Sequence, residues 1–328
     1  MYTLSWKRYR RRFRQPLHTA YGIWEFRDGL LLKLEDSDGK SGYGEVAPIP
    51  WFGTETLDSA RLQIAGLGES VSPEVLRDIP GNCPCCRFAL SSALAGLDDG
   101  GPVEGRRLPV ATLLPAGEGA QVILEERINE GFLVAKIKIG LGETEKEMIQ
   151  IERLCGLLPE GGALRLDANG GLSTAIAARW MAFSADLPIE FVEQPLPIDD
   201  PDGLVGLAGD FPTPVALDES VVKVDDLKRW RDRGWDGLYV IKPALAGNLP
   251  ELLDELGNDD VFVFSTAMET AIARYSSLKV AFGNPSRRAL GFGVGAFFFG
   301  VYDEPFLSSD HEFSVDLDRE WEGAAELK

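Results

Sequence analysis

Short apolar runs alternate with helix-like segments from about residue 108 onward, and this alternation restricts the fold more than any other feature. The runs number eight and read PVATLL, VAKIKIG, ALRLDAN, PIEFVEQ, PVALDES, GLYVIKP, VFVFST and ALGFGVG. They recur at roughly one strand–helix unit of about 25 residues. Helical patterns such as ETEKEMIQIERLCGLL and TAIAARWMAFSA lie between them. Short buried strands that alternate with helices predict a parallel sheet.

Eight regular units favour a closed barrel over an open sheet, and no GxGxxG turn supports a doubly wound open sheet. Residues 1–107 differ, because strand-like runs flank the turn DSDGK and helical segments follow. The predicted fold class is α/β: a modified TIM-type (β/α)7β or (β/α)8 barrel over 108–300, with an α+β capping domain over 1–107. The tail, about 301–328, is expected to pack back on this domain.

The composition restricts the kinds of molecule that this chain can be expected to bind. The formal net charge is −19, which argues against binding to nucleic acid or to an anionic membrane. No segment approaches the roughly 18 apolar residues of a membrane span, and no apolar stretch follows the N-terminal arginine run as a secretory signal requires. We therefore expect a cytoplasmic protein with a small-molecule ligand. An anionic substrate would need local positive charge, from a metal or from lysines.

The cysteines do not form a recognisable metal or disulfide pattern. Three of the four lie in the motif CPCC, as Cys83, Cys85 and Cys86, and the fourth is Cys155. Only two histidines are present and no second CxxC follows, so zinc spacing is not met. In a cytosolic protein disulfides are not expected, and a structural or incidental role is predicted for the cysteines.

Charged or polar residues stand at the carboxyl ends of five successive predicted strands, where barrels build their active sites. In chain order these residues are Lys136 and Lys138, then Arg165, Asp167 and Asn169, then Glu193, then Asp218 and Glu219, and finally Lys242. One buried acid at a strand end is often only the cap of the next helix. Three acids on adjacent strands are harder to explain in that way.

Carboxylates from three adjacent strands form a hard oxygen site that suits Mg²⁺. Without a cation, the clustered carboxylates of Asp167, Glu193 and Asp218 would repel one another and be costly to bury. The sequence therefore predicts a magnesium site at these three residues.

The lysines flank this site. Side chains alternate along a strand, so Ala135, Ile137 and Ile139 share one face of the second run and Lys136 and Lys138 share the other. That second face is either solvated or directed into the barrel. Strands two and six of an eight-stranded ring are opposite each other, which places Lys138 and Lys242 on two sides of the metal. Like charges disfavour protonation, and a neutral lysine is a competent base near pH 7.

The set KIK, DAN, EQP, DES and IKP resembles the enolase superfamily, in its muconate-lactonizing-enzyme-like subgroup. The resemblance covers nearly the whole chain, including the cap. Within the subgroup, RLDAN, FALSSALAGL, FSTAMET and GFGVG are most similar to the o-succinylbenzoate synthase family, dehydratases of menaquinone and phylloquinone biosynthesis.

This resemblance implies a role for each residue. Asp167, Glu193 and Asp218 would bind Mg²⁺, for which Mn²⁺ is the expected substitute. Lys138 would remove the proton next to a substrate carboxylate, and Lys242 would stabilise the resulting enediolate by its charge. A syn loss of water from 2-succinyl-6-hydroxy-2,4-cyclohexadiene-1-carboxylate then gives aromatic 2-succinylbenzoate. Lys136 would lie beside Lys138 and help to set its pKa. Asn169 and Glu219 would orient the metal ligands and the lysines, and Arg165 would pair with charged groups under the site.

The resemblance also implies that two loops of the cap, LHTAYGI and APIPWFGTE, cover the barrel mouth. Tyr21, Trp51 and Phe52 are then expected to exclude water from the substrate, although such aromatic residues can equally be domain core. Ser265 and Thr266, at the end of the seventh strand, are expected at the succinyl carboxylate; plain strand capping is the alternative.

Other functions stay open. N-succinylamino acid racemase would use the same two lysines, and muconate cycloisomerase is a further alternative. The absence of acids in GFGVGAFFFG disfavours a dipeptide epimerase, and the lack of barrel-end histidines disfavours the mandelate-racemase type. A non-catalytic metal-binding barrel is the alternative from a different class.

Overall fold

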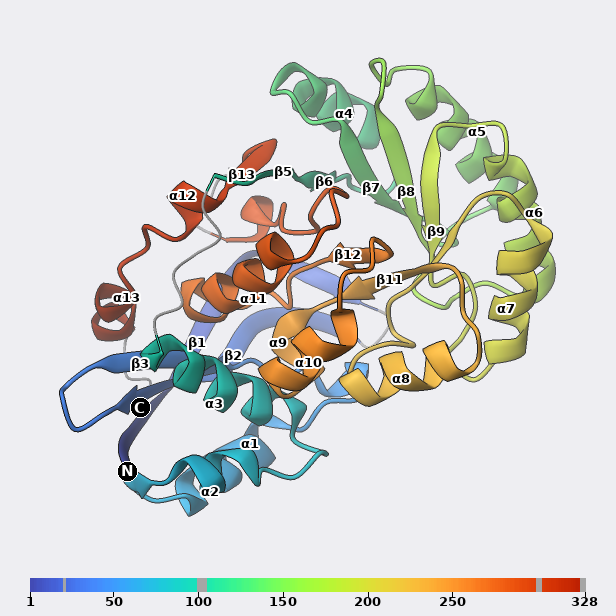
Figure 1. The fold of residues 1–328 in the computed structure, drawn as a ribbon. Coiled ribbons are helices and arrows are strands. Elements are labelled where there is room, and N and C mark those ends of the chain that lie inside the picture. Colours follow the sequence, from blue (N-terminus) through green and yellow to red (C-terminus); the bar gives the residue numbers. More distant parts are fainter. Residues whose placement is uncertain (20–21, 99–104, 299–302, 325–328) are drawn as a thin grey trace.

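The N-terminal part of the chain is an antiparallel sheet (Figure 1), and its strand order is β3-β2-β1-β4. The computed structural model describes residues 1–19, 22–98, 105–298 and 303–324. The strands of this sheet are β1 (Tyr2–Thr19), β2 (Gly22–Glu35), β3 (Ser41–Val46) and β4 (Ser70–Val71). The predicted hairpin joins β2 to β3, and its turn is closed by Asp36 Oδ1, which accepts hydrogen bonds from the N–H groups of Asp38 and Lys40 at 2.9 Å.

Three helices cover one face of this sheet: α1 (Leu57–Gly66), α2 (Pro73–Arg77) and α3 (Pro84–Leu97). The small-residue helix α3 lies directly on β3. A Cβ atom at Gly42 would be 1.9 Å from the carbonyl oxygen of Ala93, and one at Gly44 would be 1.9 Å from that of Ala89. Glycine is therefore required at both positions of β3 for the helix to approach so closely.

Seven parallel strands form the second sheet, in the order β12-β11-β10-β9-β8-β7-β6. They are β6 (Ala111–Leu113), β7 (Val134–Lys138), β8 (Ala163–Asp167), β9 (Ile189–Glu193), β10 (Val215–Leu217), β11 (Leu238–Ile241) and β12 (Phe262–Phe264). Each coincides with one of the first seven predicted runs, which confirms the parallel sheet.

The eighth predicted run joins the two edges of this sheet. Leu290 forms a parallel bridge to Val110 beside β6, and Gly291 forms one to Ser265 beside β12. The N–H of Ala111 donates to Leu290 at 2.9 Å, and the N–H of Gly291 donates to Phe264 at 2.8 Å. The sheet therefore curls into a barrel, and the predicted α/β fold with a cap is confirmed.

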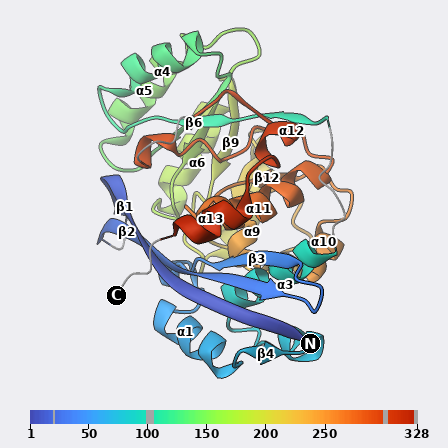
Figure 2. The ribbon, with the colours of Figure 1, turned by 90° about the vertical axis from the view of Figure 1, so that its left-hand side faces the viewer.

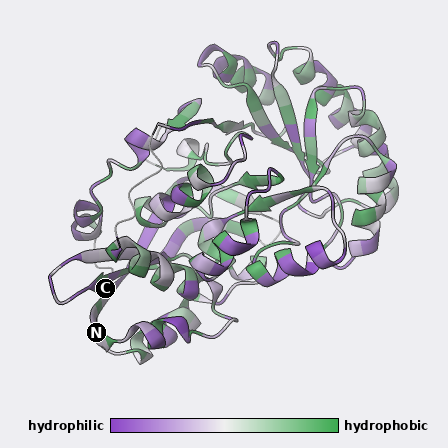
Figure 3. Ribbon diagram, viewed as in Figure 1, coloured by the Kyte–Doolittle hydropathy of each residue, from purple (hydrophilic) through white to green (hydrophobic). Residues whose placement is uncertain are grey.

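Helices surround the barrel, as Figure 1 shows for α4 to α8. They are α4 (Ala120–Asn129), α5 (Thr144–Cys155), α6 (Thr174–Ser184), α7 (Pro201–Asp210), α8 (Val224–Asp232), α9 (Pro243–Ala246), α10 (Leu249–Leu256) and α11 (Ala271–Gly283). Apolar strand residues are buried against them, as at Ala135 and Ile137. The strands β7 to β9 are accordingly mostly hydrophobic, whereas the surrounding helices carry hydrophilic stretches (Figure 3).

The C-terminal segment returns to the cap. Its elements are η2 (Gly295–Phe297), β13 (Phe306–Ser308), α12 (Ser309–Glu312) and α13 (Leu317–Gly323), and β13 pairs with β5 (Arg107–Pro109). Leu317 and Trp321 of α13 pack against Tyr9 and Tyr43 of the cap sheet, and α13 lies above that sheet in Figure 2. The division at residues 107 and 300 stays a prediction.

Candidate active site

The register of the strands brings the predicted charged residues together at one end of the barrel. Lys138 of β7 is paired with Asp167 of β8, which is in turn paired with Glu193 of β9. Asp218 directly follows β10, and Lys242 directly follows β11. Because these five strands are neighbours in the sheet, their carboxyl ends form one continuous rim.

The alternation along β7 separates its apolar and charged residues. Ala135, Ile137 and Ile139 are buried against the outer helices, with 1–2% of their surfaces exposed. Lys136 and Lys138 instead line a cavity of about 410 Å³ inside the barrel mouth, together with all three predicted metal ligands. Of the two interpretations of the lysine face, the structure therefore supports the one directed into the barrel.

Two lysines are bound to the carboxylates in ion pairs. Lys136 Nζ lies 2.8 Å from Asp167 Oδ2 and also contacts Glu193 Oε1. Lys242 Nζ contacts Asp218 Oδ1. The three acids are 1–4% exposed. Each ammonium is thus desolvated only in the presence of its counter-charge, as a buried ion requires.

This burial shifts the pKa values of the cluster. Burial acts to lower the pKa of Lys136, but the carboxylates of Asp167 and Glu193 outweigh it and hold the pKa above its ordinary value. Burial acts to raise the pKa of Asp167, and Lys136 more than compensates and keeps it lowered. Burial and the neighbouring Asp167 and Asp218 raise the pKa of Glu193 to about 8. The nearby lysines therefore do not supply enough positive charge to offset burial and mutual repulsion at all three carboxyls.

The three carboxylates are of the residue type that binds a hard, oxygen-coordinated cation. The raised pKa of Glu193 marks an excess of negative charge, and the buried Glu219 Oε2 has no hydrogen-bond partner among residues 1–19, 22–98, 105–298 and 303–324. In the described ranges, however, no three Asp, Glu, His or Cys side chains are arranged so that they could hold a metal ion; the ion pairs of Lys136 and Lys242 take up these carboxylates instead. The assignment of the three acids as metal ligands stays a prediction.

Hydrogen bonds join neighbouring strand ends behind the acids. Asn169 Nδ2 donates to Glu219 Oε1 at 3.1 Å, and the N–H of Asn169 donates to Asp167 Oδ1 at 3.0 Å. Gln194 was not selected from the sequence, although it is the Q of EQP. Its Oε1 accepts from the N–H groups of Asp218 and Ser220 at 3.1 Å, and it is fully buried.

Two of these residues have unusual backbone conformations. Asn169 has φ 45° and Gln194 has φ 37°, in the left-handed region that costs free energy for residues other than glycine. Each follows a predicted metal ligand by one or two positions. Such strain is typical of sites whose side chains must be aimed in one direction.

Arg165 lies deeper in the barrel, 1% exposed. Its Nε donates to Glu190 Oε2 at 2.7 Å, and its guanidinium lies 4.9 Å from the centre of the Phe191 ring. Arg288 reaches the other oxygen of Glu190 at 3.4 Å. Arg165 therefore forms an ion pair with Glu190 below the cavity, and it contributes to the floor of the cavity and not to its side walls.

Aromatic residues of the cap form the walls of the cavity. Trp51 and Phe52, both predicted, line it, and so do Trp24 and Leu17, which the sequence did not single out. The rings of Trp24 and Trp51 are 5.0 Å apart at 88°, and Lys242 Nζ lies 4.7 Å from the centre of the Phe52 ring. Tyr21 lies outside the described residues.

Ser265 and Thr266 line the cavity from the end of β12. Ser265 Oγ donates to the carbonyl of Gly291 at 3.1 Å, and Thr266 Oγ1 donates to Glu269 Oε2 at 2.6 Å. Both hydroxyl protons are therefore used inside the protein. Each oxygen can still accept a hydrogen bond, but an anionic carboxylate would have to displace one of these contacts.

The cysteine motif CPCC begins helix α3. Glu55 occupies the helix N-terminus, where its carboxylate accepts hydrogen bonds from the N–H groups of Cys85 and Cys86 at 3.2 and 2.8 Å. Burial and Glu55 raise the pKa of Cys83 above its ordinary value. Such thiols are poor nucleophiles.

Among the helices of the described residues, none has the length and apolar character that a membrane span requires.

Comparison with known proteins gives two family matches and close relatives. The family "MenC, N-terminal domain" matches residues 13–97, and "Enolase C-terminal domain-like" matches residues 120–254. An o-succinylbenzoate synthase from Thermosynechococcus vestitus is 39% identical over 88% of this chain and 92% of that protein. One from Aliivibrio salmonicida is 30% identical over 75% of this chain and 76% of that protein.

The fold agrees with a solved structure. The o-succinylbenzoate synthase from Thermosynechococcus elongatus, with Mg in its active site, superposes with a TM-score of 0.85 and 35% identity, over 98% of this chain and 99% of that one. A capped barrel with acids and lysines at its strand ends defines an enzyme of the enolase superfamily. Within that class, the chain belongs to the o-succinylbenzoate synthase family.

Proposed function

We propose that this chain catalyses the Mg²⁺-dependent syn dehydration of 2-succinyl-6-hydroxy-2,4-cyclohexadiene-1-carboxylate to 2-succinylbenzoate, in menaquinone and phylloquinone biosynthesis. Family membership supports the reaction class. The observation that carries the proposal is the placement of Lys138 and Lys242 on one cavity, with Asp167, Glu193 and Asp218 on the strands between them. We also propose a cytosolic location.

Lys138 is the proposed base. Lys136 is held between Asp167 and Glu193, which raises its pKa and keeps it protonated. Lys138 lines the same cavity and, among the described residues, forms no ion pair within 4.0 Å. A neutral amine there would take the proton from the carbon next to the substrate carboxylate. The resulting ammonium would return that proton to the departing β-hydroxyl, which leaves as water and gives the aromatic ring.

Lys242 is the proposed electrostatic partner. Its strand, β11, is four positions from β7 in the ring, so the two lysines approach a substrate from opposite sides. The ion pair with Asp218 and the ring of Phe52 position its ammonium. A fixed positive charge there would stabilise the negative charge that develops on the substrate carboxylate as the proton leaves.

Asp167, Glu193 and Asp218 are the proposed ligands of Mg²⁺, and Mn²⁺ is the expected substitute because it also prefers oxygen ligands. When bound, the cation supplies charge neutralisation at the substrate carboxylate. Asn169 and Glu219 would orient these ligands through the hydrogen bond between them. Arg165 of β8 would hold the neighbouring strand β9 in place through its ion pair with Glu190.

The walls of the cavity are the proposed basis of substrate choice. Trp51 and Phe52 would exclude water, and Tyr21 is proposed for the same role from the sequence alone. Ser265 and Thr266 would meet the succinyl carboxylate. An ultraviolet assay for loss of the cyclohexadiene, with Mg²⁺, with Mn²⁺ and with chelator, tests the proposed reaction. Turnover that is unchanged in chelator would contradict the metal requirement, and no turnover with any cation would contradict the function.

N-succinylamino acid racemase is the second candidate, because both lysines face one cavity. A racemase takes a proton from one face and returns it to the other, so both lysines must exchange protons. A syn elimination needs only one. In heavy water, rapid inversion of an N-succinylamino acid with deuterium uptake would favour the racemase; fast dehydration with negligible inversion favours the synthase.

A further inference from the structure

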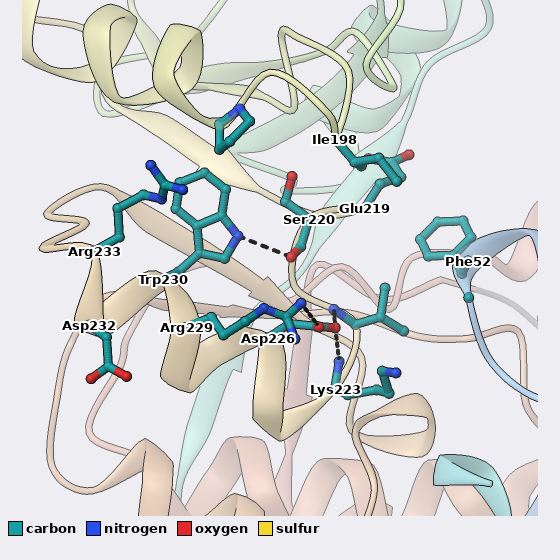
Figure 4. A pocket seen from close by; sticks show the side chains of 13 residues that line it. Phe52, Ile198, Glu219, Ser220, Lys223, Asp226, Arg229, Trp230, Asp232 and Arg233 are labelled. Atoms are coloured by element: carbon teal, nitrogen blue, oxygen red, sulfur yellow. Dashed lines mark hydrogen bonds and ion pairs between the residues drawn. The ribbon is translucent and has the colours of Figure 1, made fainter. Parts of the chain in front are cut away.

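A second cavity, of about 700 Å³, is shown in Figure 4 with the residues that line it. We call the two the outer and the inner cavity. The outer cavity is bounded by the loop after β10, by helix α8 and by the start of α7. Phe52 and Glu219 line both cavities. The outer cavity is therefore adjacent to the proposed catalytic residues and is not a remote groove.

Phe52 separates the two cavities. On the inner side its ring faces Lys242 Nζ at 4.7 Å, and the same side chain borders the outer cavity. Phe52 ends the short helix Pro50–Phe52, and the following Gly53 has φ 86°; apart from its chain neighbours, no described residue has an atom within 4 Å of where a Cβ would be. The Phe52 side chain is partly buried and packs against the core of the cap, so passage between the two cavities requires it to be displaced.

The cations of the outer cavity differ in their partners. Arg229 is paired with Asp226, and Arg233 is paired with Asp202 at 2.7 Å. Lys223 has no carboxylate partner within 4.0 Å among the described residues. Figure 4 shows its ammonium directed away from the Arg229–Asp226 pair. Lys223 is thus a cation of the outer cavity that forms no ion pair with a carboxylate in the described part of the chain.

The remaining surface of the outer cavity suits a ring. Trp230 lines it, and its indole Nε1 donates to the carbonyl of Ser220 at 3.1 Å, which fixes the ring. Phe52 and the exposed Ile198 add further apolar surface. Glu219 and Asp232 also line the cavity, so a multiply charged anion would meet repulsion away from Lys223. A six-membered ring with a carboxylate near Lys223 fits this distribution.

We propose that the outer cavity is an entry site, where Lys223 binds a carboxylate of the cyclic dicarboxylate substrate before the substrate passes Phe52 into the inner cavity. This proposal rests on the proposed function. The chain has a net charge of −19, which repels anions at long range. A local cation at the cavity mouth therefore raises the rate of productive encounter, and salt weakens its effect.

Kinetics of Lys223→Glu and Lys228→Glu test the entry site. Both residues carry the same charge close to each other in the chain, but Lys228 of α8 does not line the outer cavity. For Lys223→Glu, kcat/KM is expected to fall about fivefold at low salt, with kcat changed less than about twofold, and the difference should shrink as salt rises. Lys228→Glu should match the wild type. Equal effects of the two variants, or a loss in kcat alone, would overturn the entry site.

Equilibrium binding separates this proposal from the proposed function. Calorimetric titration of 2-succinylbenzoate, in chelator to remove the contribution of the cation, needs no turnover. Wild type and Lys228→Glu are expected to bind with the same affinity, and Lys223→Glu about fivefold more weakly. Lys223-dependent binding in a protein without dehydratase activity would leave the entry site standing and remove the function. Binding that is absent, or equal in all three proteins, would overturn the entry site.

Discussion

Lys136 Nζ lies between carboxylates of two neighbouring strands, 2.8 Å from Asp167 Oδ2 and in contact with Glu193 Oε1. Both acids are almost completely buried. The lysine therefore neutralises charges that water cannot reach. Removing one member of such a group leaves an uncompensated buried charge, which is more costly than the loss of any surface ion pair.

Lys136→Met tests this relationship, since methionine keeps most of the side-chain length without the charge. We expect the free energy of unfolding to fall by about 3 kcal/mol and turnover to fall about 10- to 100-fold, because the carboxylates are no longer held in place. Urea denaturation measures the first and the ultraviolet assay the second. Lys33→Met is the matched control, since its pair with the half-exposed Glu35 should be worth less than about 1 kcal/mol. Equal losses in the two variants would contradict the special position of Lys136.

Asp167→Asn tests the metal site. A cation that binds only the folded state raises its stability in proportion to the logarithm of its concentration. The thermal midpoint of the wild type is therefore expected to rise with Mg²⁺, and that of Asp167→Asn to stay constant. Asp199→Asn, on the exposed loop after β9, should behave like the wild type. A magnesium-dependent rise in Asp167→Asn would exclude Asp167 as a ligand.

The rim of charged residues was predictable because two simple periodicities determine it. Side chains alternate along a strand, and the carboxyl ends of parallel strands meet at one edge of a sheet. Reading the end of each apolar run was therefore enough to collect Lys138, Asp167, Glu193 and Asp218, without any knowledge of the loops. The register confirms that these positions are neighbours.

Contacts between distant segments could not be predicted in this way. Trp24 and Leu17 enter the cavity from the cap, and no local pattern distinguishes them from core residues. Glu45 binds Thr270, which is 225 positions away in the chain. Gln194 accepts a hydrogen bond from the N–H of Asp218, at the end of the next strand. This contact depends on the left-handed backbone of Gln194, which neither a glutamine nor the residues beside it indicate.

Stability should depend on pH through the acids of the rim. Burial, with Asp167 and Asp218, raises the pKa of Glu193 from 4.5 to about 8, and burial with Asp218 raises that of Glu219 to about 7. Without a cation, the folded protein thus holds more protons than the unfolded chain at pH values between 4.5 and about 8. Because ν_N exceeds ν_U there, the free energy of unfolding should fall as pH rises from about 5 to about 8 and then level off. The lowered pKa of Asp167 acts only below this window.

Urea denaturation in chelator at several pH values measures this trend. Glu193→Gln, which cannot titrate, should show a much smaller fall over the same range. Stability that rises through the window in the wild type would show that these carboxyls are ionised in the folded protein. Mg²⁺ should oppose the fall, because a ligand carboxyl must lose its proton to bind the cation.

Glu45 should hold the cap on the barrel. It is fully buried in β3 and accepts hydrogen bonds from Thr270 Oγ1 at 2.6 Å, from the N–H of Ala273 at 3.1 Å and from the hydroxyl of Tyr9. Its charge also lies at the N-terminus of α11, where an anion is favourable. Glu45→Ala is expected to cost about 3 kcal/mol of stability and to raise KM, because the segment with Trp51 follows β3. Tyr9→Phe, which removes one of these bonds, should cost about 1 kcal/mol; a larger loss than for Glu45→Ala would contradict this account.

Gln194 should determine the affinity for the cation without touching it. Its Oε1 accepts from the N–H groups of Asp218 and Ser220 at 3.1 Å, and its Nε2 donates to Ser220 Oγ at 2.8 Å. These bonds join the end of β9 to the segment that carries Asp218. Gln194→Ala removes them while Glu193, next to it, keeps its side chain.

We therefore expect Gln194→Ala to raise the dissociation constant for Mg²⁺ at least about tenfold, as is usual when a partner that orients a metal ligand is removed. Calorimetric titration of the cation measures the constant, and circular dichroism checks that the variant is folded. Gln150→Ala is the control, since the hydrogen bond that Gln150 donates to the carbonyl of Gly117 lies at the surface. A folded Gln194→Ala protein with the affinity of the wild type would show that Asp218 is positioned by its strand alone.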